Sequence, residues 1–171
     1  MRERGFSLVE LAMVLLILAI ASAAIALSVR PPLARVGLRG CLDGMAAFDR
    51  LTRTFAQEHD RPLRLVLDLA AGRLRRTGED GREDLGEALR LPAGHRIREV
   101  RLADRAVASG NVALSVSARG LTPSYAALVE GPGERRQWVL VAGLTGQVTE
   151  TTDEGTVRGA LEALEARHHA R

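Results

Sequence analysis

The chain has 171 residues, with 24 basic and 21 acidic ones, and every basic residue other than the histidines is an arginine. The acids are interleaved with the arginines, so there is no basic stripe of the kind that binds nucleic acid, and three Phe, one Tyr and one Trp are too few for a base-stacking platform. The single cysteine, Cys41, excludes an intramolecular disulfide and a thiolate metal cluster. We expect it to be a small buried side chain on a helix, with an intermolecular bridge as the alternative.

The N-terminal segment carries the most specific pattern. It reads Arg4-Gly5-Phe6-Ser7-Leu8-Val9-Glu10 and continues as an apolar stretch over 11–29, with Glu10 as the one charge between Phe6 and Arg30. As a helix, this stretch is long enough to cross a bilayer, which takes roughly 20 residues. An acidic residue costs about 2.5–3.5 kcal/mol near the bilayer centre and less near the end of a segment. Glu10 is therefore expected to have a function and a partner.

The glycine, the aromatic residue, Ser7, Glu10 and the long apolar run together resemble the N-terminal signature of type IV pilins and type II secretion pseudopilins, the type IV filament subunits. The resemblance implies that a prepilin peptidase cuts after Gly5 and methylates the new N-terminus, Phe6. It also implies that Glu10 pairs with the free amine of a neighbouring subunit's first residue during filament assembly. A buried carboxylate and a buried ammonium are each costly alone, which agrees with such a pairing.

Two other interpretations of this segment stay open. Ser7 and Glu10 have the spacing of a helix capping box, in which Glu10 only closes the first turn of an ordinary helix. The run also fits a secretory signal with 11–20 as its apolar region and a small-residue cleavage site at 21–23. The filament subunit is favoured by the acidic residue at the start of the apolar region and by the apolar residues that continue beyond that cleavage site.

Helical periodicity is expected to resume after the apolar stretch. Pro31 and Pro32 should kink or interrupt the chain there, because proline removes a donor and clashes with the preceding turn. Apolar residues then recur at spacings of three or four, which predicts an amphipathic helix from about 33 to 58. Its apolar face consists of Leu38, Leu42, Met45, Phe48, Thr52 and Phe55. Charged residues fall largely elsewhere on the helix: Arg39, Asp43, Asp49, Arg50 and Arg53.

From Arg61 and Pro62 the pattern changes to period two, which predicts strands. The expected strands cover 63–69, 73–76, 89–92, 97–102, 112–116, 125–130, 138–142 and 147–151. The charged, glycine-rich stretch 77–86 lacks the spacing of an EF-hand and is expected to be a solvated loop. Strands at this spacing after one long helix indicate an α+β fold with a mainly antiparallel sheet.

The second half resembles one branch of the filament subunits. It has an alternating strand that ends in Ser117-Ala118-Arg119-Gly120, then Thr122-Pro123, and a later strand that leads into Leu144-Thr145-Gly146-Gln147-Val148. This order is similar to the head of H-type minor pseudopilins and of the related FimT-like minor pilins, over roughly residues 35–150. The apolar stretch over 11–29 contains no proline, unlike that of many major subunits, which also favours a minor subunit.

The last residues, 153–171, are expected to form a helical tail in which Val157, Leu161 and Leu164 share one face. That face would dock on the head or bind a partner subunit, or the tail would fray. Acidic residues offset the arginines of the tail. This argues against a DNA-binding role of the tail like that of some FimT-like pilins. The adjacent His168 and His169 are expected to be solvated and not to bind a metal.

No enzyme motif occurs: the sequence contains no Walker A motif, no G-x-S-x-G elbow and no H-E-x-x-H. We therefore expect no catalytic residue, no cofactor, no metal ligand and no small-molecule substrate.

These patterns predict an α+β, pilin-like chain, in which a long N-terminal helix with a transmembrane first half packs on a mainly antiparallel β-sheet head. The expected parts are a leader peptide at 1–5, a transmembrane or filament-core helix at 6–29, an amphipathic helix at 30–58, a β-rich periplasmic head at 59–152 and the helical tail at 153–171.

The function implied by the resemblance is that of a minor pseudopilin of a type II secretion system. Such a structural subunit passes once through the bacterial inner membrane and joins other pseudopilins, through its N-terminal helix, in a periplasmic filament. A minor type IV pilin in pilus assembly or DNA uptake is the alternative, and an exported or membrane-anchored binding domain outside any filament is the second. The orientation in the membrane is inferred from the resemblance, because the positive charges do not decide it. Arg2 and Arg4 precede the apolar stretch, but Arg30, Arg35 and Arg39 follow it.

Overall fold

The computed structural model of the chain describes the backbone of residues 8–169 and the side chains of 11–22 and 37–166. The chain forms two compact units, Met1–Val36 and Gly37–Arg171. The predicted leader, 1–5, lies outside the described residues.

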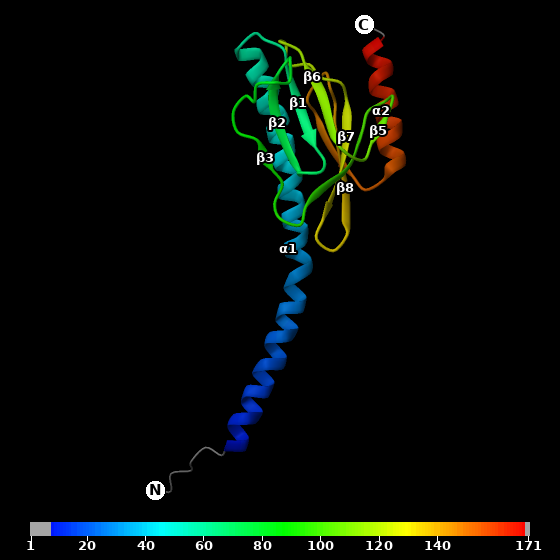
Figure 1. Cartoon of the computed structure of the whole chain (residues 1–171). Coiled ribbons are helices and arrows are strands. Elements are labelled where there is room, and N and C mark those ends of the chain that lie inside the picture. Colours follow the sequence, from blue (N-terminus) through cyan, green and yellow to red (C-terminus); the bar gives the residue numbers. More distant parts are fainter. Residues whose placement is uncertain (1–7, 170–171) are drawn as a thin grey trace. The chain divides into compact units, whose positions relative to one another are not determined.

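One helix, α1, extends from Leu8 to Glu58 (Figure 1). It contains Pro31 and Pro32, so of the two effects expected of the proline pair, a kink or an interruption, the interruption does not occur. Each proline costs a helix about 3 kcal/mol relative to alanine. The alanine- and leucine-rich sequence on both sides favours helix strongly enough to continue it across the pair.

Within the part of the chain that the structure describes, no helix is both long enough and apolar enough to span a membrane. The predicted transmembrane first half of the N-terminal helix is therefore not confirmed.

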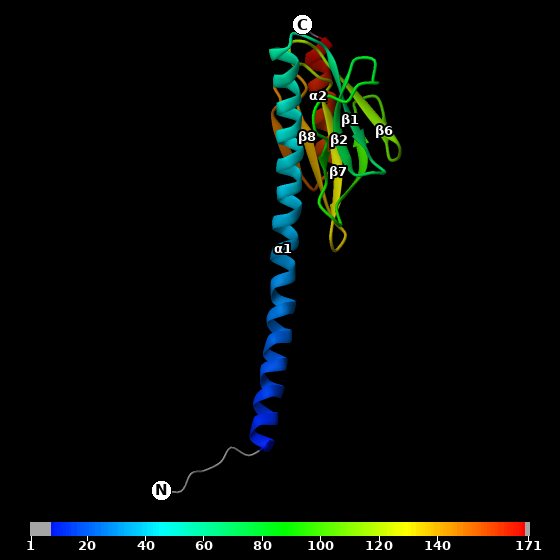
Figure 2. The same ribbon diagram turned by 60° about the vertical axis from the view of Figure 1, so that its left-hand side comes forward.

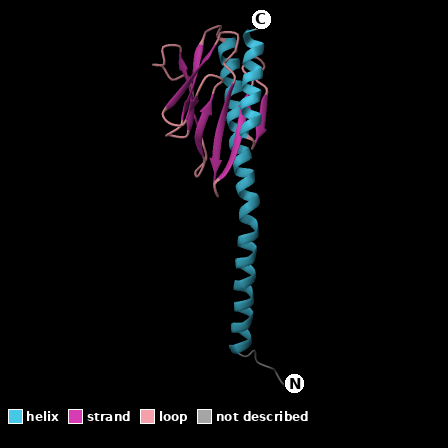
Figure 3. Cartoon of the chain, turned by 90° about the vertical axis from the view of Figure 1, so that its right-hand side faces the viewer, coloured by secondary structure: helices cyan, strands magenta, loops and turns pink. Residues whose placement is uncertain are grey.

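The second unit contains two antiparallel sheets where the strand pattern predicted one. The first sheet has the order β3-β2-β1-β6, with β1 (Leu63–Asp68), β2 (Arg73–Gly78), β3 (Leu89–Arg90) and β6 (Asn111–Val116). The second has the order β5-β4-β7-β8-β9, with β4 (Arg96–Arg101), β5 (Ala106–Val107), β7 (Tyr125–Gly131), β8 (Arg135–Val141) and β9 (Val148–Thr151). All the described strands lie in this unit (Figure 3).

The eight predicted strands are confirmed, with their ends shifted by a few residues. The ninth, β5, was missed, because its two residues, Ala106 and Val107, show no alternation of apolar and polar side chains. The division into two sheets follows from the pairing: β6 returns to pair with β1, whereas β4 pairs with β7. Strand periodicity shows where a strand lies but not which partner it takes, so the sequence pattern alone did not reveal two sheets.

The main core lies between α1 and the inner faces of both sheets (Figure 2). Leu38, Leu42, Met45 and Phe48 of α1 are buried there, as the helical spacing predicted. Cys41 is also buried, and this burial raises the pKa of its thiol to about 11. The thiol is therefore protonated near neutral pH and is a small core side chain, as expected.

A second helix, α2 (Glu154–His169), packs on the other face of the second sheet (Figure 1). Tyr125 of β7 faces the main core, whereas its neighbour Ala126 contacts α2, because side chains alternate along a strand. Val157 and Leu161 are almost fully buried against this face. Of the three alternatives for the tail, the structure shows docking on the head.

Asp153 fixes the start of α2. Its carboxylate accepts hydrogen bonds from the backbone N–H of Gly155 at 3.2 Å and of Thr156 at 2.8 Å. It also accepts one from the Thr156 hydroxyl at 2.5 Å. A side chain that caps the first turn in this way stabilises a helix by about 1 kcal/mol.

Candidate functional site

The predicted site residues lie at the N-terminus. Gly5 and Phe6 are outside the described residues. Glu10 lies in α1, but its side chain is outside the described ones. The predicted cleavage after Gly5, the methylation of Phe6 and the assembly role of Glu10 therefore stay predictions.

The described helix that follows Glu10 exposes large apolar side chains on every side. Eight of them between residues 11 and 20 are 45–63% exposed: Leu11, Met13, Val14, Leu15, Leu16, Ile17, Leu18 and Ile20. A helix that is apolar all round is expected to be buried, in a protein core or in lipid. An exposed apolar patch larger than a few hundred Å² marks an interaction surface in a soluble protein. Residues 11–20, here called the apolar segment, therefore require a partner surface.

A buried polar network lies near the other end of α1, and sequence reasoning missed it. Asp49 and Arg53, placed off the apolar face by their charge, are only 1% and 8% exposed. The Arg53 Nε donates to the Asp49 carboxylate at 2.6 Å, and the hydroxyl of buried Tyr125 donates to the same carboxylate at 3.1 Å. Burial, and secondly the Asp49 charge, raise the pKa of Tyr125 well above its ordinary value.

The same arginine ties α1 to two loops of the head. Its Nη1 donates to the carbonyl of Gly143 at 2.6 Å and of Gly120 at 3.2 Å, and its Nη2 donates to the Thr122 hydroxyl at 2.6 Å. A guanidinium presents five donors in a fixed fork, so it satisfies several acceptors at once. The network therefore fixes the helix against these loops. The sequence contained one sign that Asp49 is buried: it follows the core residue Met45 by four positions, and residues four apart lie on the same face of a helix.

A second charged cluster crosses three strands of the second sheet. The largely buried carboxylate of Glu130, on β7, accepts hydrogen bonds from Arg98 at 2.7 Å and from Arg136 at 3.1 Å. Arg96 donates to the same carboxylate through two nitrogens. The hydrogen bonds from Arg98, and then from Arg96, lower the pKa of Glu130 to about 2. The carboxylate is therefore charged at any physiological pH and joins β4, β7 and β8.

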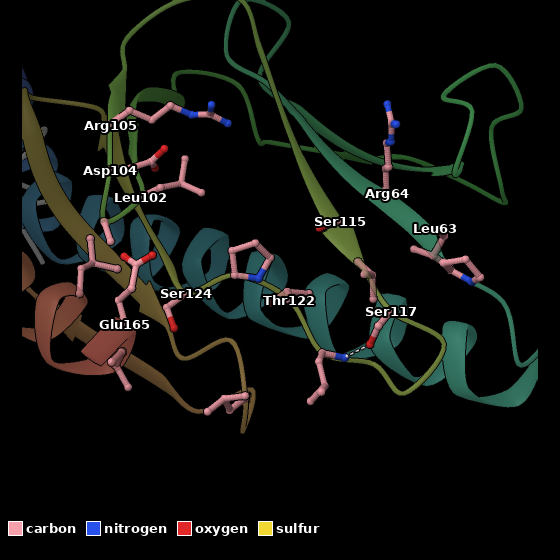
Figure 4. Close-up of a pocket in the computed structure, with 18 of the residues that line it drawn as sticks. Leu63, Arg64, Leu102, Asp104, Arg105, Ser115, Ser117, Thr122, Ser124 and Glu165 are labelled. Carbon is pink, nitrogen blue, oxygen red and sulfur yellow. Dashed lines mark hydrogen bonds between the residues drawn. The ribbon is translucent and has the colours of Figure 1, made fainter. Parts of the chain in front are cut away.

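The head also has a groove of about 690 Å³. Figure 4 shows Ser115 and Ser117, at the end of β6, on one wall and Leu102, Asp104 and Arg105 on the other. Leu121, Pro123 and Leu144 line it as well, and α2 contributes Leu161, Leu164 and Glu165. Its surface is mainly apolar, with charged side chains among the lining residues. Among the residues that the structure describes, no cluster of three or more His, Cys, Asp or Glu side chains has a metal-binding arrangement.

Comparison with known proteins places one motif on the chain. The family model of the prokaryotic N-terminal methylation motif matches residues 1–26. No curated protein and no solved structure matches the chain. The matched residues contain Gly5, Phe6 and Glu10 together with the whole apolar segment.

The buried network gives a first prediction. Arg53→Met should lower the free energy of unfolding by about 3–5 kcal/mol, because it leaves the Asp49 carboxylate buried without its partner. Arg50→Met is the matched control: Arg50 is exposed on the same helix, so its loss should change stability by less than about 0.5 kcal/mol. Urea unfolding of the full chain in a mild detergent, followed by Trp138 fluorescence, measures both. Equal stability of the two variants would contradict the structural role of Arg53.

The Glu130 cluster gives a second prediction, on pH. The folded chain has a Glu130 pKa of about 2 against an ordinary 4.5, so the unfolded chain binds more protons between these values. The stabilisation by this carboxylate is therefore complete above about pH 4.5 and is lost as the pH falls towards 2. Glu130→Gln should unfold at a lower temperature than the parent chain at pH 6, and the two should converge at pH 2.

The control for this experiment is Glu134→Gln, which removes an exposed carboxylate from the same hairpin. Its melting temperature should follow that of the parent chain at both pH values. A difference between Glu130→Gln and the parent chain that is the same at pH 6 and pH 2 would show that the charge of Glu130 does not stabilise the fold.

Proposed function

We propose that this chain, which the N-terminal methylation motif indicates to be a type IV pilin-like precursor, is a minor pseudopilin of a type II secretion system. In this proposal it is a structural subunit of a periplasmic pseudopilus that drives protein export across the outer membrane, and it has no enzymatic activity of its own. The prepilin peptidase processes the precursor, and the product assembles with other pilins or pseudopilins. The observation that carries the proposal is that the motif, at residues 1–26, includes the start of a helix that exposes apolar side chains on every side.

The apolar segment explains why assembly would be favourable. Each side chain that passes from water into a helix bundle gains free energy in proportion to its buried apolar area, at about 25 cal/mol per Å². Eight large side chains that are about half exposed in the isolated chain contribute together. Before assembly, the same side chains would be buried in lipid. We therefore propose that the precursor passes once through the inner membrane, with its head in the periplasm.

Glu10 would give this packing its register. Apolar contacts are not directional, so they alone do not specify where one subunit stops against the next. A carboxylate inside the apolar bundle is tolerated only with a partner, and the amine of the processed N-terminus, at Phe6, supplies one. The head, with two antiparallel sheets on the second half of α1, would then lie outside the bundle.

The H-type subclass rests on the second half of the sequence. The strand order and the turns at 117–123 and 144–148 are similar to the heads of H-type minor pseudopilins and FimT-like minor pilins. A minor type IV pilin in pilus assembly or DNA uptake is the second candidate, since it would share the same motif and helix.

Glu10→Ala provides the test of assembly. The variant should be processed and should keep a folded head, yet be absent from filaments sheared from the host, because its apolar helix lacks the charged partner for the neighbouring N-terminus. Immunoblotting of the sheared and membrane fractions measures its distribution. Glu162→Ala, which removes an exposed acid of α2, is the control and should enter filaments normally.

The same strains separate the two candidates. If Glu10→Ala stops the export of type II substrates and leaves pili intact, the pseudopilin is supported; the loss of pili or of DNA uptake with normal export supports the minor pilin. Incorporation of Glu10→Ala into filaments at the level of the parent chain would contradict the proposed role of Glu10.

A further inference from the structure

Strand β6 has an open edge. The order β3-β2-β1-β6 places it last in the first sheet. The Leu69 N–H donates to the Gly110 carbonyl at 3.0 Å, one position beyond the register pair Asp68↔Asn111. Hydrogen-bonded and non-hydrogen-bonded pairs alternate in an antiparallel ladder, so Val112, Leu114 and Val116 are the β6 residues that bond to β1. The N–H and C=O groups of Asn111, Ala113 and Ser115 therefore point to the open side.

This edge lacks the features by which proteins usually protect a sheet edge, such as short strands, charged side chains, proline or a bulge. The other edge strands in the described head are short: β3 and β5 have two residues each, and β9 has four. In contrast, β6 has six residues, Asn-Val-Ala-Leu-Ser-Val, without a charge or a proline. No register shift interrupts its pairing with β1.

The groove begins at the end of this edge. Ser115, Val116 and Ser117 line it from the β6 side, and the Ser117 N–H bonds to the Leu121 carbonyl at 2.9 Å, which closes the edge beyond β6. Leu121 and Leu144, which also line the groove, are each more than a third exposed. Figure 4 shows the space between the β6 wall and the wall that carries Leu102 and Arg105. Unpaired backbone groups and an apolar groove are thus adjacent.

We propose that β6 and this groove bind an extended peptide segment of a partner protein as an additional strand of the first sheet. The backbone of the segment would pair with Ala113 and Ser115 of the open edge, which is the recognition mode of β-strand addition. Every second side chain of the segment would enter the groove on the side of Val116, so apolar residues at alternate positions are required. The partner is recognised by this alternation, and the inference does not depend on filament assembly.

The probe for the test is a fluorescein-labelled peptide, Lys-Thr-Val-Thr-Val-Thr-Val-Thr-Lys, mixed with the full chain in a mild detergent. It should raise the fluorescence anisotropy in a saturable way and slow hydrogen exchange at the amides of Ala113 and Ser115. A peptide of the same composition with its three valines adjacent should bind at least tenfold more weakly, because at most two of them can lie on the same face of an extended strand and enter the groove.

Ala113→Pro tests the edge itself. It removes the outward N–H but no hydrogen bond to β1, so the sheet should stay intact and the affinity for the peptide should fall at least tenfold. Ala113→Thr keeps the N–H and is the matched control, with unchanged affinity. Leu144→Asp tests the groove independently: it places a charge on an exposed lining position and should also weaken binding.

The inference is wrong if the alternating peptide does not bind, if the Ala113→Pro and Ala113→Thr variants bind it with equal affinity, or if hydrogen exchange slows at sites other than the β6 edge. Sedimentation of the full chain supplies one more: self-association that Ala113→Pro abolishes would assign the edge to a second copy of the chain instead of a peptide.

Discussion

The structure depends on one constraint, the burial of apolar surface along α1. In the second unit, this surface meets the inner faces of two sheets, and Leu42 and Met45 are almost completely buried. In the apolar segment, the same kind of side chain is about half exposed in the single chain. Because such exposure is unfavourable in water, the first part of the helix requires a partner that the single chain does not supply. In the proposed function, a filament bundle, or lipid before assembly, would supply this partner.

The head combines this apolar core with charged groups that are placed inside it. Asp49, Arg53 and Tyr125 form a network in which each buried polar group has a partner. Such a network adds direction to apolar packing, because one arginine contacts acceptors from α1 and from two loops of the head. Glu130 acts similarly across β4, β7 and β8. The helix and the second sheet are thus held in one arrangement by hydrogen bonds as well as by apolar contacts.

Much of the fold could be predicted from local periodicity. Spacings of two, three or four predict the apolar positions of α1 in the head, eight of the nine described strands, and the docking face of α2 with Val157 and Leu161. The division into two sheets could not be predicted, because it depends on contacts between distant strands. The burial of Asp49 and Arg53 was missed for the same reason: their partners Tyr125, Thr122 and Gly143 are far away in the sequence. The N-terminal motif was recognisable from its residues, and the family model matches there, whereas the roles of Gly5, Phe6 and Glu10 rest on the sequence alone.

As a proposed filament precursor, the chain is expected to be processed after Gly5 before its helix enters a filament. The intact mass and N-terminal sequence of the mature protein from its native host test this processing. The mature chain should begin at Phe6 and carry one additional methyl group on its amine. A mature chain that begins near Ala24 would contradict this processing, since it would lack Glu10 and the whole apolar segment, as after removal of an ordinary secretory signal.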